Sequence, residues 1–594
     1  FFLLKRLLET KNRKIGTIIS IFFYLNCIFL ITYIFMNYLS GDGINDAILF
    51  HLKFGIKGFG INEYIIPFIF FIFLNLILLI SFKTFINNLS SNTTKTSKQK
   101  TISIFVLLIS FIFNPFYKDV FLLFSSGNSN IKIDNNFYYE QDNITNKNEK
   151  NIIFVYLEQI ERTYLNNDIF PNLTPNLSRL DKKSISFTDI DSPRATNWTI
   201  AGMAASQCGI PLLTPIASEN SMSGIDKFMP LANCIGDILS EQNYQLHYVG
   251  GSDLDFAGKG NFYKSHGFEH VEGWYELEDI INDRNYRSPW GIYDDELLNI
   301  IYNRAEKLNN KNINFGLFSL TLDTHHPNGY ISKSCKNNKY QDGSNPILNS
   351  VHCVDELIGR FMDTYLNSKI YNNTILVLLS DHLALKNTAT NMLEKGDRKN
   401  LFMIFDKSTK PQYINSYGNV FDVGPTVMGF LGLNTDGLGL GRNLITSKSL
   451  SETHDMDFVI SLNKRKILDL WSFPSLDDGF KILDNENKIL FGERFINYPA
   501  LIILDPSNEV DQIMFDFYYA NPLKNKVQNL GKNINYVWID KCSKIYSYKN
   551  LNEINNPSEN CLLIQDSKNI KFKITSTKDK TINSNLIKEY FNDE

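Results

Sequence analysis

The chain has 594 residues, and its 59 basic and 63 acidic side chains leave a formal net charge of −4 at pH 7. This length exceeds that of one ordinary domain and predicts several units of about 150 residues each. The charges form no long run of one sign, which argues against a nucleic-acid partner and against a polybasic membrane patch.

Three long apolar stretches predict a transmembrane domain over residues 1–125. They cover Ile15–Ser40, Tyr64–Phe82 and Thr101–Tyr117, of which the last is short. A cleaved signal peptide fits poorly, because the first stretch is too long and others follow it. The missing initiator Met and the opening FFLL suggest that the numbered chain begins inside or just after an earlier span.

Basic residues around these stretches predict the orientation of the chain. Residues 5–14 carry five of them and residues 83–100 carry four, whereas the loop between the first two spans carries only Lys53 and Lys57. Because loops rich in Lys and Arg stay in the cytoplasm, everything after residue 118 is expected on the other side. The large soluble part is therefore predicted to be extracytoplasmic.

Six of the seven cysteines lie in this soluble part, where an oxidising compartment favours disulfides. Six cysteines allow 15 connectivities, and six unpaired buried thiols are the alternative. Closure of short local loops favours the pairs Cys208–Cys234, Cys335–Cys353 and Cys542–Cys561.

Beyond the membrane part, composition predicts a linker and two domains. Residues 126–150 are polar and aperiodic, which is typical of a linker. An α/β domain is expected over 151–450, because apolar runs with the character of buried parallel strands alternate there with helical stretches. Over 451–594, short alternating segments between Asn, Gly and Pro turns predict a small strand-rich domain. The four clearest apolar runs of the α/β domain are 151–158, 244–253, 314–326 and 373–382.

Three of these runs stop on titratable side chains, and ligands of open α/β sheets bind at the carboxyl ends of strands. Glu158 ends the first run, 323–326 (Asp-Thr-His-His) ends the third, and Asp381–His382 ends the fourth. Each could be a salt bridge or a cap, but the three together favour a site. Two carboxylates and one imidazole suit Mn²⁺, Mg²⁺ or Zn²⁺ and leave positions open for a substrate. Glu161 is interpreted as a partner of Arg162 or a solvated residue.

Thr199 stands in NWTIAGMAASQ, where a helix of small residues is expected to begin. A helix N-terminus suits an anionic centre, and a base or metal could make the hydroxyl a nucleophile. From this pattern alone, however, a simple N-cap is the favoured interpretation of Thr199.

Seven stretches, in order and covering nearly all of residues 151–445, resemble the alkaline phosphatase/sulfatase superfamily in its lipoteichoic-acid-synthase-like branch of lipid-headgroup transferases. The resemblance implies a mixed, mostly parallel sheet between helices, and it is far more specific than any single motif. The stretches are VYLEQIERTYLN, FPNLTPNLSRL, ATNWTIAGMAASQCGIPLLTP, GGSDLDFAGKGNFYKSHGFE, TLDTHHPNGYIS, LLSDHLALKN and DVGPTVMGFLG...GLGRNL.

The resemblance also implies a set of site residues. Glu158, Thr199, Asp381 and His382 would coordinate one divalent cation, with Thr199 as the nucleophile. Mn²⁺ is the expected ion, as in the lipoteichoic acid synthases, and Mg²⁺ and Zn²⁺ are the alternatives.

Substrate contacts are implied for four further residues. The family's histidine that recognises glycerol phosphate falls on His325, with His326 beside it, and either would protonate or position the leaving oxygen. Trp198 precedes the nucleophile. Where the lipoteichoic branch has a Trp-x-Arg pair, this chain has FAGKGNFYKS, so Lys259 is the expected cation.

The function implied is that of a phosphotransferase in a bacterial inner membrane, multi-pass, with its catalytic domain in the periplasm. It would move phosphoglycerol from phosphatidylglycerol to osmoregulated periplasmic glucans through a phosphothreonine-type intermediate. Its partners would be the lipid donor, the oligosaccharide acceptor and the bilayer.

Four alternatives remain. A lipoteichoic acid synthase would share the first half-reaction, and a lipid A phosphoethanolamine transferase matches the sequence less closely. A sulfatase is the least favoured enzyme, because its formylglycine needs a Cys or Ser in a C/S-x-P-x-R context that Thr199 lacks. An inactive membrane-anchored sensor or binding protein is disfavoured, because every expected ligand position is present.

Overall fold

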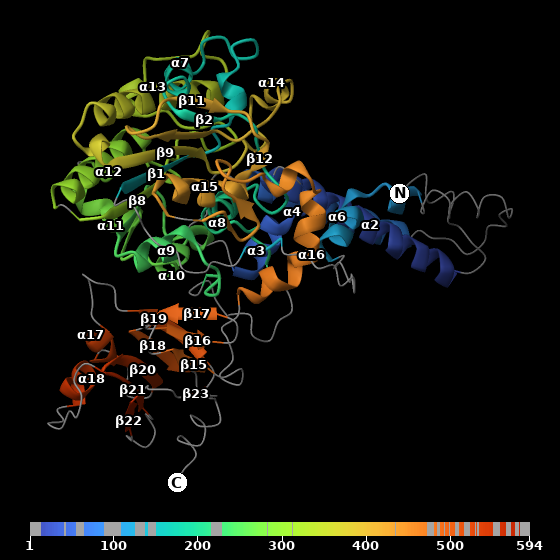
Figure 1. Cartoon of the computed structure of the whole chain (residues 1–594). Coiled ribbons are helices and arrows are strands. Elements are labelled where there is room, and N and C mark those ends of the chain that lie inside the picture. The colour runs from blue at the N-terminus through green and yellow to red at the C-terminus, as the bar shows by residue number, and fades with distance from the viewer. Residues whose placement is uncertain are drawn as a thin grey trace.

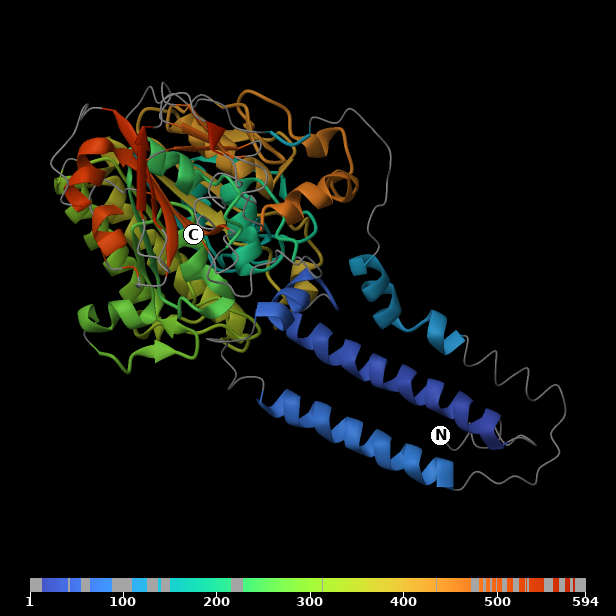
Figure 2. The same ribbon diagram turned by 90° about the horizontal axis from the view of Figure 1, so that it is seen from below.

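The computed structural model has apolar N-terminal helices, an α/β body and a strand-rich C-terminal part (Figure 1). Seen from below, the N-terminal helices project away from the α/β body (Figure 2). The residues described are 13–40, 43–54, 65–87, 109–124, 137–139, 150–214, 228–281, 283–311, 313–433, 435–471, 480–483, 488–491, 494–497, 499–504, 510–515, 523–528, 530, 534–549, 559–565, 572–576 and 581–582.

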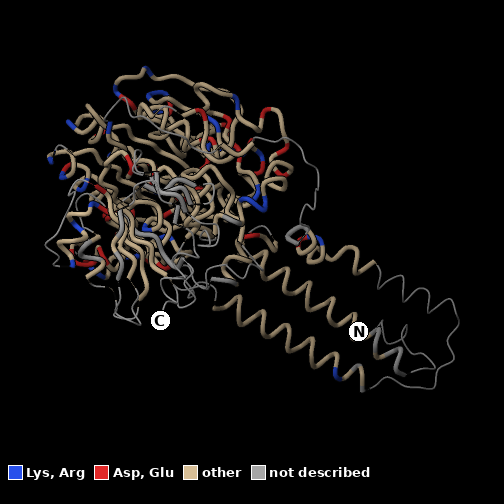
Figure 3. Tube along the Cα trace, turned by 60° about the horizontal axis from the view of Figure 1, so that its bottom comes forward, with Lys and Arg blue, Asp and Glu red and all other residues tan. Residues whose placement is uncertain are grey.

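Two N-terminal helices are long and apolar enough to cross a membrane. They are α2 (Arg13–Ser40) and α4 (Ile65–Asn87), with candidate spans at Ser20–Ser40 and Ile65–Thr84 by length and composition. Figure 3 shows almost no charged residue along either helix. The first part of the third expected span lies outside the described residues, and its later part leads into α6 (Pro115–Phe124).

The centre of the α/β body is an eight-stranded sheet in the order β11-β2-β10-β9-β1-β8-β4-β5. The four expected strands are confirmed, and they lie side by side in parallel as β9-β1-β8-β4. Only β10 runs antiparallel to its neighbours, so the sheet is mixed and mostly parallel. Its strands are β1 (Asn151–Leu157), β2 (Ile185–Phe187), β4 (Gln245–Gly250), β5 (His270–Glu272), β8 (Phe315–Leu320), β9 (Thr374–Ser380), β10 (Phe402–Phe405) and β11 (Gln412–Ile414).

Helices cover both faces of this sheet, as apolar runs without polar alternation require. On β1, Phe154 belongs to the apolar cluster of one face and Val155 to that of the other. The first face packs against α8 (Thr199–Cys208), α9 (Ile235–Glu241), α10 (Lys259–Ser265) and α15 (Val423–Phe430); the second packs against α7 (Pro175–Asp181), α12 (Asp294–Asn310) and α13 (Pro346–Leu366). Short elements include β3 (Ile190–Asp191), β6 (Arg287–Ser288), β7 (Gly291–Ile292), α11 (Trp274–Leu277), α14 (Thr390–Leu393), β12 (Gly418–Asn419), β13 (Gly437–Leu438) and β14 (Gly441–Arg442).

Helix α8 approaches the end of β9 closely, because the residue at the contact is Gly202. A methyl group built at Gly202 would lie 1.7 Å from the carbonyl oxygen of Asp381. Gly209 ends the helix in the left-handed conformation, with φ of 67°. The N-terminus of α8 is thus held directly against the carboxyl end of β9.

Helix α3 (Asp46–Phe54), from the loop between α2 and α4, packs on the α/β body. Phe50 is fully buried in the cluster of the first sheet face, and its ring lies 6.1 Å from that of Phe228. Nε of Arg194 donates a 3.1 Å hydrogen bond to Asp46. Helix α3 therefore belongs to the same packed body as the sheet.

The three expected disulfides are present, and among the described residues only Cys27 of α2 is unpaired. One disulfide joins the last residue of α8 to the loop before α9. The pairs are Cys208–Cys234, Cys335–Cys353 and Cys542–Cys561.

The C-terminal part is strand-rich, as expected. A five-stranded antiparallel sheet has the order β19-β18-β20-β21-β22, and a four-stranded sheet has the order β17-β16-β15-β23. Its elements are β15 (Phe480–Leu483), β16 (Lys488–Phe491), β17 (Arg494–Asn497), β18 (Ala500–Leu504), β19 (Val510–Phe515), α17 (Leu523–Gln528), β20 (Asn535–Lys541), α18 (Cys542–Lys549), β21 (Asn560–Gln565), β22 (Phe572–Ser576) and β23 (Thr581–Ile582).

Helix α16 (Met456–Asp469) follows the expected domain boundary at residue 450 but packs into the α/β core. Val459 and Trp471 are buried in the same apolar cluster as α8, and the Trp471 indole donates a 2.8 Å hydrogen bond to the Leu213 carbonyl. We therefore propose that the boundary between the two soluble domains follows Trp471.

The contact at Gly202 can be tested by substitution. Gly202→Ala should push the start of α8 away from Asp381 and cost about 1–3 kcal/mol of stability, as overpacking does. Ala204→Gly is the matched control, because it costs about 1 kcal/mol in helix propensity without adding an atom. Thermal denaturation of both variants checks this, and an unchanged midpoint for Gly202→Ala would contradict the close approach.

Candidate active site

Two adjacent strands bring three potential metal ligands together. Glu158 follows β1, and Asp381 and His382 follow β9; each side chain is at most 1% exposed. Nε2 of His382 lies 3.2 Å from Oδ2 of Asp381 and 3.8 Å from Oε1 of Glu158. One ligand atom from each residue falls within 4.8 Å of the others. These three residues are called the metal group below.

The metal group fits a divalent cation. Nδ1 of His382 lies 2.7 Å from the Leu383 carbonyl oxygen, so Nδ1 carries the proton and Nε2 presents a lone pair. Oδ2 of Asp381 is buried without a hydrogen-bond partner. Burial raises the pKa of Asp381 to about 6 and also raises that of Glu158. Buried lone pairs that face one another are costly unless a cation lies between them.

Thr199 lies beside the metal group as the first residue of α8. Its hydroxyl is 3.5 Å from Oε2 of Glu158. The N-cap interpretation is wrong, because the cap position is occupied by Trp198 in an extended conformation. The Trp198 indole Nε1 is buried and has no hydrogen-bond partner. The N-terminus of α8 thus places the Thr199 hydroxyl and the positive end of the helix dipole beside the metal group.

Gln159, which the sequence did not single out, connects the metal group to His326. Its side-chain oxygen accepts a 3.2 Å hydrogen bond from the Leu385 N–H, so its NH₂ group must point the other way. Nε2 donates to Oε1 of Glu158 and to Nδ1 of His326, both at 2.9 Å. Its backbone N–H donates to Oδ1 of Asp381 at 2.8 Å. Gln159 therefore fixes both carboxylates and one imidazole.

The two histidines after β8 consequently hold opposite tautomers. His326 accepts at Nδ1, so its proton is on Nε2. Nδ1 of His325 lies 2.8 Å from the His326 carbonyl oxygen, which can only accept, so this ring has its lone pair on Nε2. Burial lowers the pKa of His326 to about 3 and strongly lowers that of His325. Both rings are neutral, and one offers a donor while the other offers an acceptor.

Lys259 begins α10 and is only 2% exposed. Burial lowers the pKa of its ammonium group, whereas the charges of Glu158 and Asp381 act in the opposite direction. Its Nζ lies 5.0 Å from the centre of the Phe256 ring. The structure therefore places the cation expected from FAGKGNFYKS within electrostatic reach of the metal group.

Glu161 differs from the interpretation based on the sequence. Glu161 is fully buried, and its partners are Nε of Arg398 at 3.1 Å and the N–H of Ala384 at 3.1 Å rather than Arg162. It holds the chain just after His382 in place. Arg398 is more than 200 residues away from Glu161 in sequence, so no local sequence pattern predicts this pair.

Asp323, at the end of the third expected strand, does not face the metal group. Its Oδ2 accepts a 2.6 Å hydrogen bond from the hydroxyl of Ser332 and lies 3.3 Å from the N–H of Asp294. The hydroxyl of Thr324 donates to the Glu158 carbonyl oxygen. These two residues brace strand ends, while His325 and His326 approach the site.

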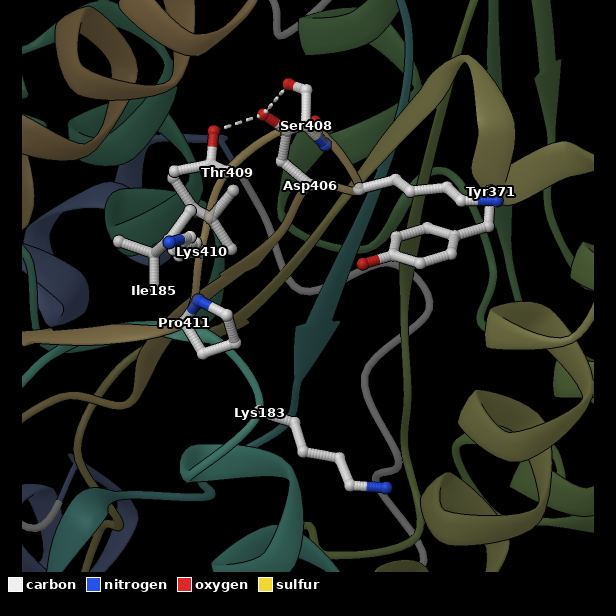
Figure 4. A pocket seen from close by; sticks show the side chains of 10 residues that line it. Lys183, Ile185, Tyr371, Asp406, Ser408, Thr409, Lys410 and Pro411 are labelled. Carbon is white, nitrogen blue, oxygen red and sulfur yellow. Dashed lines mark hydrogen bonds between the residues drawn. The ribbon is translucent and has the colours of Figure 1, made fainter.

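A separate pocket of about 410 Å³ lies near β10 and the loop that follows it (Figure 4). Because β10 is antiparallel to β9, this loop lies at the end of the sheet opposite Asp381. Asp406 in the pocket accepts hydrogen bonds from Ser408 and Thr409 at 2.7 and 2.6 Å. None of the expected site residues lines this pocket.

Three family models match the chain. The model described as Sulfatase matches residues 150–433, which hold the whole central sheet and identify the α/β body as sulfatase-like. The model of the phosphoglycerol transferase I N-terminal domain matches 1–133, and that of its middle domain matches 478–589.

One curated relative and two solved structures are similar to this chain. Phosphoglycerol transferase I of Salmonella arizonae is 36% identical over 535 residues, which cover 89% of this chain and 69% of the relative. A solved protein in the alkaline phosphatase superfamily from Vibrio parahaemolyticus is 18% identical and covers 63% of this chain and 81% of its own, with a TM-score of 0.42. A lipoteichoic acid synthase from Listeria monocytogenes is 18% identical and covers 56% and 82%, with a TM-score of 0.41.

Cation binding should depend on pH with a definite sign. Protons compete with the metal for Asp381 and Glu158, whose pKa values burial raises to about 6 and about 8, so affinity should rise as the pH increases through this range. Each carboxylate that must lose a proton contributes about tenfold in affinity per pH unit below its pKa. Metal titration of the purified chain measures this. Asp381→Asn should abolish binding, whereas the exposed Asp397→Asn should not; equal binding by both variants would rule out the metal group.

Without the Gln159 amide, the proton of the neutral His326 ring should no longer be restricted to Nε2. In Gln159→Leu, ring-¹⁵N NMR of the chain, which has nine histidines, should show His326 no longer restricted to the Nε2–H tautomer. Metal affinity should also fall, by about 10–100-fold, as is common when a partner of a ligand is lost. The exposed Gln341→Leu is the control. An unchanged His326 signal in Gln159→Leu would show that this amide does not set the tautomer.

Proposed function

Because the chain belongs to the phosphoglycerol transferase I family, we propose that it transfers phosphoglycerol from phosphatidylglycerol to periplasmic osmoregulated glucans. The observation that carries the proposal is the position of the Thr199 hydroxyl, 3.5 Å from Glu158 and at the N-terminus of α8. A phosphotransferase needs a nucleophile there, next to donors for the phosphate oxygens.

Thr199 is the nucleophile of a two-step displacement. In the first step its oxygen forms a bond to phosphorus, the bond to diacylglycerol breaks, and diacylglycerol leaves with the proton that Thr199 gave up. In the second step a glucan hydroxyl oxygen attacks the phosphorus, and its proton returns to Thr199. Phosphoglycerol is thereby carried on the threonine between donor and acceptor.

The residues around Thr199 bind the phosphate oxygens and the headgroup of the substrate. Nε2–H of His326 donates to a phosphate oxygen, and Nε2 of His325 accepts from a substrate hydroxyl. Lys259 and the indole N–H of Trp198 supply positive charge and a donor for the headgroup. Because His326 is neutral, it positions an oxygen rather than protonating it.

Members of the sulfatase and alkaline phosphatase superfamily bind a divalent metal, and the metal group offers two carboxylates and one imidazole for it. We assign Glu158, Asp381, His382 and the Thr199 oxygen to this ion. Mn²⁺ is the proposed ion, since a mixed oxygen and nitrogen set suits it. Once bound, it would act as a Lewis acid and lower the pKa of the hydroxyl.

The proposed location is a bacterial inner membrane, with the α/β body in the periplasm. Helix α3, between the two candidate spans, packs on the α/β body, so the two belong on one side of the bilayer. The N–H of Ile44, just before α3, donates a 2.9 Å hydrogen bond to Asp119 of α6. The C-terminal end of the third apolar segment therefore lies on the same side of the bilayer as α3. Disulfides in the body favour an oxidising compartment.

The proposal is tested with the full-length chain in vesicles that contain headgroup-labelled phosphatidylglycerol and an oligosaccharide acceptor. Thr199→Ala should reduce transfer by about a thousandfold or more, as loss of a nucleophile does. Thr199→Ser keeps a hydroxyl and should retain measurable transfer, and the exposed Thr446→Ala is the control.

Two results would overturn parts of the proposal. Label transfer to the oligosaccharide by Thr199→Ala would exclude Thr199 as the nucleophile. Transfer by the wild type to a lipid-linked polymer instead of the oligosaccharide would exclude the glucan acceptor.

A further inference from the structure

Aromatic rings from four separate segments form a continuous row that ends at the candidate active site. His51 of α3 stacks on Phe256, with ring centres 5.7 Å apart and planes 17° apart. The Phe256 ring lies 5.4 Å from that of Trp290, and Trp290 stacks on His325 at 3.9 Å. These four residues are called the aromatic row.

The row begins close to a candidate membrane span. Helix α3 starts at Asp46, six residues after the candidate span that ends at Ser40. Leu52, next to His51 on this short helix, is 71% exposed. Apolar and aromatic groups with one polar edge are the side chains that prefer the level of lipid headgroups.

The other end of the row lies at the candidate active site, where Trp290 stacks on His325. Nζ of Lys259 lies 5.0 Å from the centre of the Phe256 ring, so a cation for a phosphate lies beside the row, and His325 at the inner end is an acceptor for a substrate hydroxyl. The burial of Trp290, which is 6% exposed, makes the inner part of the row rigid, whereas His51 and Phe256 are partly exposed. The outer part of the row is thus partly exposed and has the Lys259 cation beside it, and the inner end is a neutral imidazole at the candidate active site.

We propose that the aromatic row is the binding site for the lipid half of the donor. The glycerol ester region and first acyl carbons of a phospholipid would lie along His51 and Phe256, so that its phosphodiester reaches Lys259 and Thr199. This inference rests on the proposed function, because it assumes a lipid donor. It adds that α3, from the membrane part of the chain, contributes directly to donor binding.

The inference separates two kinds of donor. A phospholipid in a bilayer would contact the whole row, but a water-soluble phosphodiester such as glycerol 4-nitrophenyl phosphate would occupy only the inner end. Loss of the His51 ring should therefore raise KM for phosphatidylglycerol in vesicles by about tenfold, which corresponds to about 1.4 kcal/mol. Its KM and kcat for the soluble donor should change less than about twofold, because this ring is the one farthest along the row from His325.

The experiment uses the full-length chain in vesicles and compares wild type, His51→Ala and Tyr413→Ala with both donors. Tyr413 is an exposed aromatic residue on β11, at the far edge of the sheet, and its removal should affect neither donor. As a second measurement, phosphatidylglycerol with a diazirine near the start of an acyl chain should label peptides that contain His51 or Phe256 in the wild type. This labelling does not depend on turnover.

The possible results distinguish the inference from the function. If wild type transfers phosphoglycerol from both donors and His51→Ala changes both equally or neither, the aromatic row does not bind the lipid. Labelling confined to other segments would overturn it as well. If wild type uses neither donor, the proposed function itself fails.

Discussion

The burial of three lone-pair-bearing groups at neighbouring strand ends is the constraint on which the rest of the site depends. Glu158, Asp381 and His382 meet because β1 and β9 are parallel neighbours, in register from Asn151–Thr374 to Leu157–Ser380. Nε2 of His382, with its lone pair, lies 3.2 Å from Oδ2 of Asp381, which has no hydrogen-bond partner. Such an arrangement is unfavourable by itself and becomes favourable with a divalent cation.

The surrounding structure keeps this group and its nucleophile in place. Gly202 allows α8 to touch the end of β9, so that Thr199 arrives beside Glu158. Gln159 orients both carboxylates and fixes the tautomer of His326. Most of this support comes from hydrogen bonds between segments distant in sequence. The aromatic row then extends the same site toward the membrane helices.

The sequence predicts the four parallel strands and the residues at their ends, because apolar runs that stop on charged side chains are visible locally. It does not predict the role of Gln159, whose φ of 54° and contacts to Leu385 and His326 depend on the folded arrangement. The expectation that Glu161 pairs with Arg162 or is solvated is wrong for the same reason, since its partner Arg398 is remote in sequence. The N-cap interpretation of Thr199 is wrong, because the helix begins one residue earlier than expected. Trp198 occupies the cap position, although its side chain cannot cap a helix and gives no sequence signal for that role.

The central claim is that the metal group makes Thr199 a covalent carrier of phosphoglycerol. Its most direct test is peptide mass spectrometry of the full-length chain after incubation with phosphatidylglycerol and Mn²⁺ but without acceptor. We expect phosphoglycerol on the peptide that contains Thr199, its loss on addition of acceptor, and its absence when the metal is chelated. Modification of a different residue, or turnover to product with Thr199 unmodified under trapping conditions, would contradict the account.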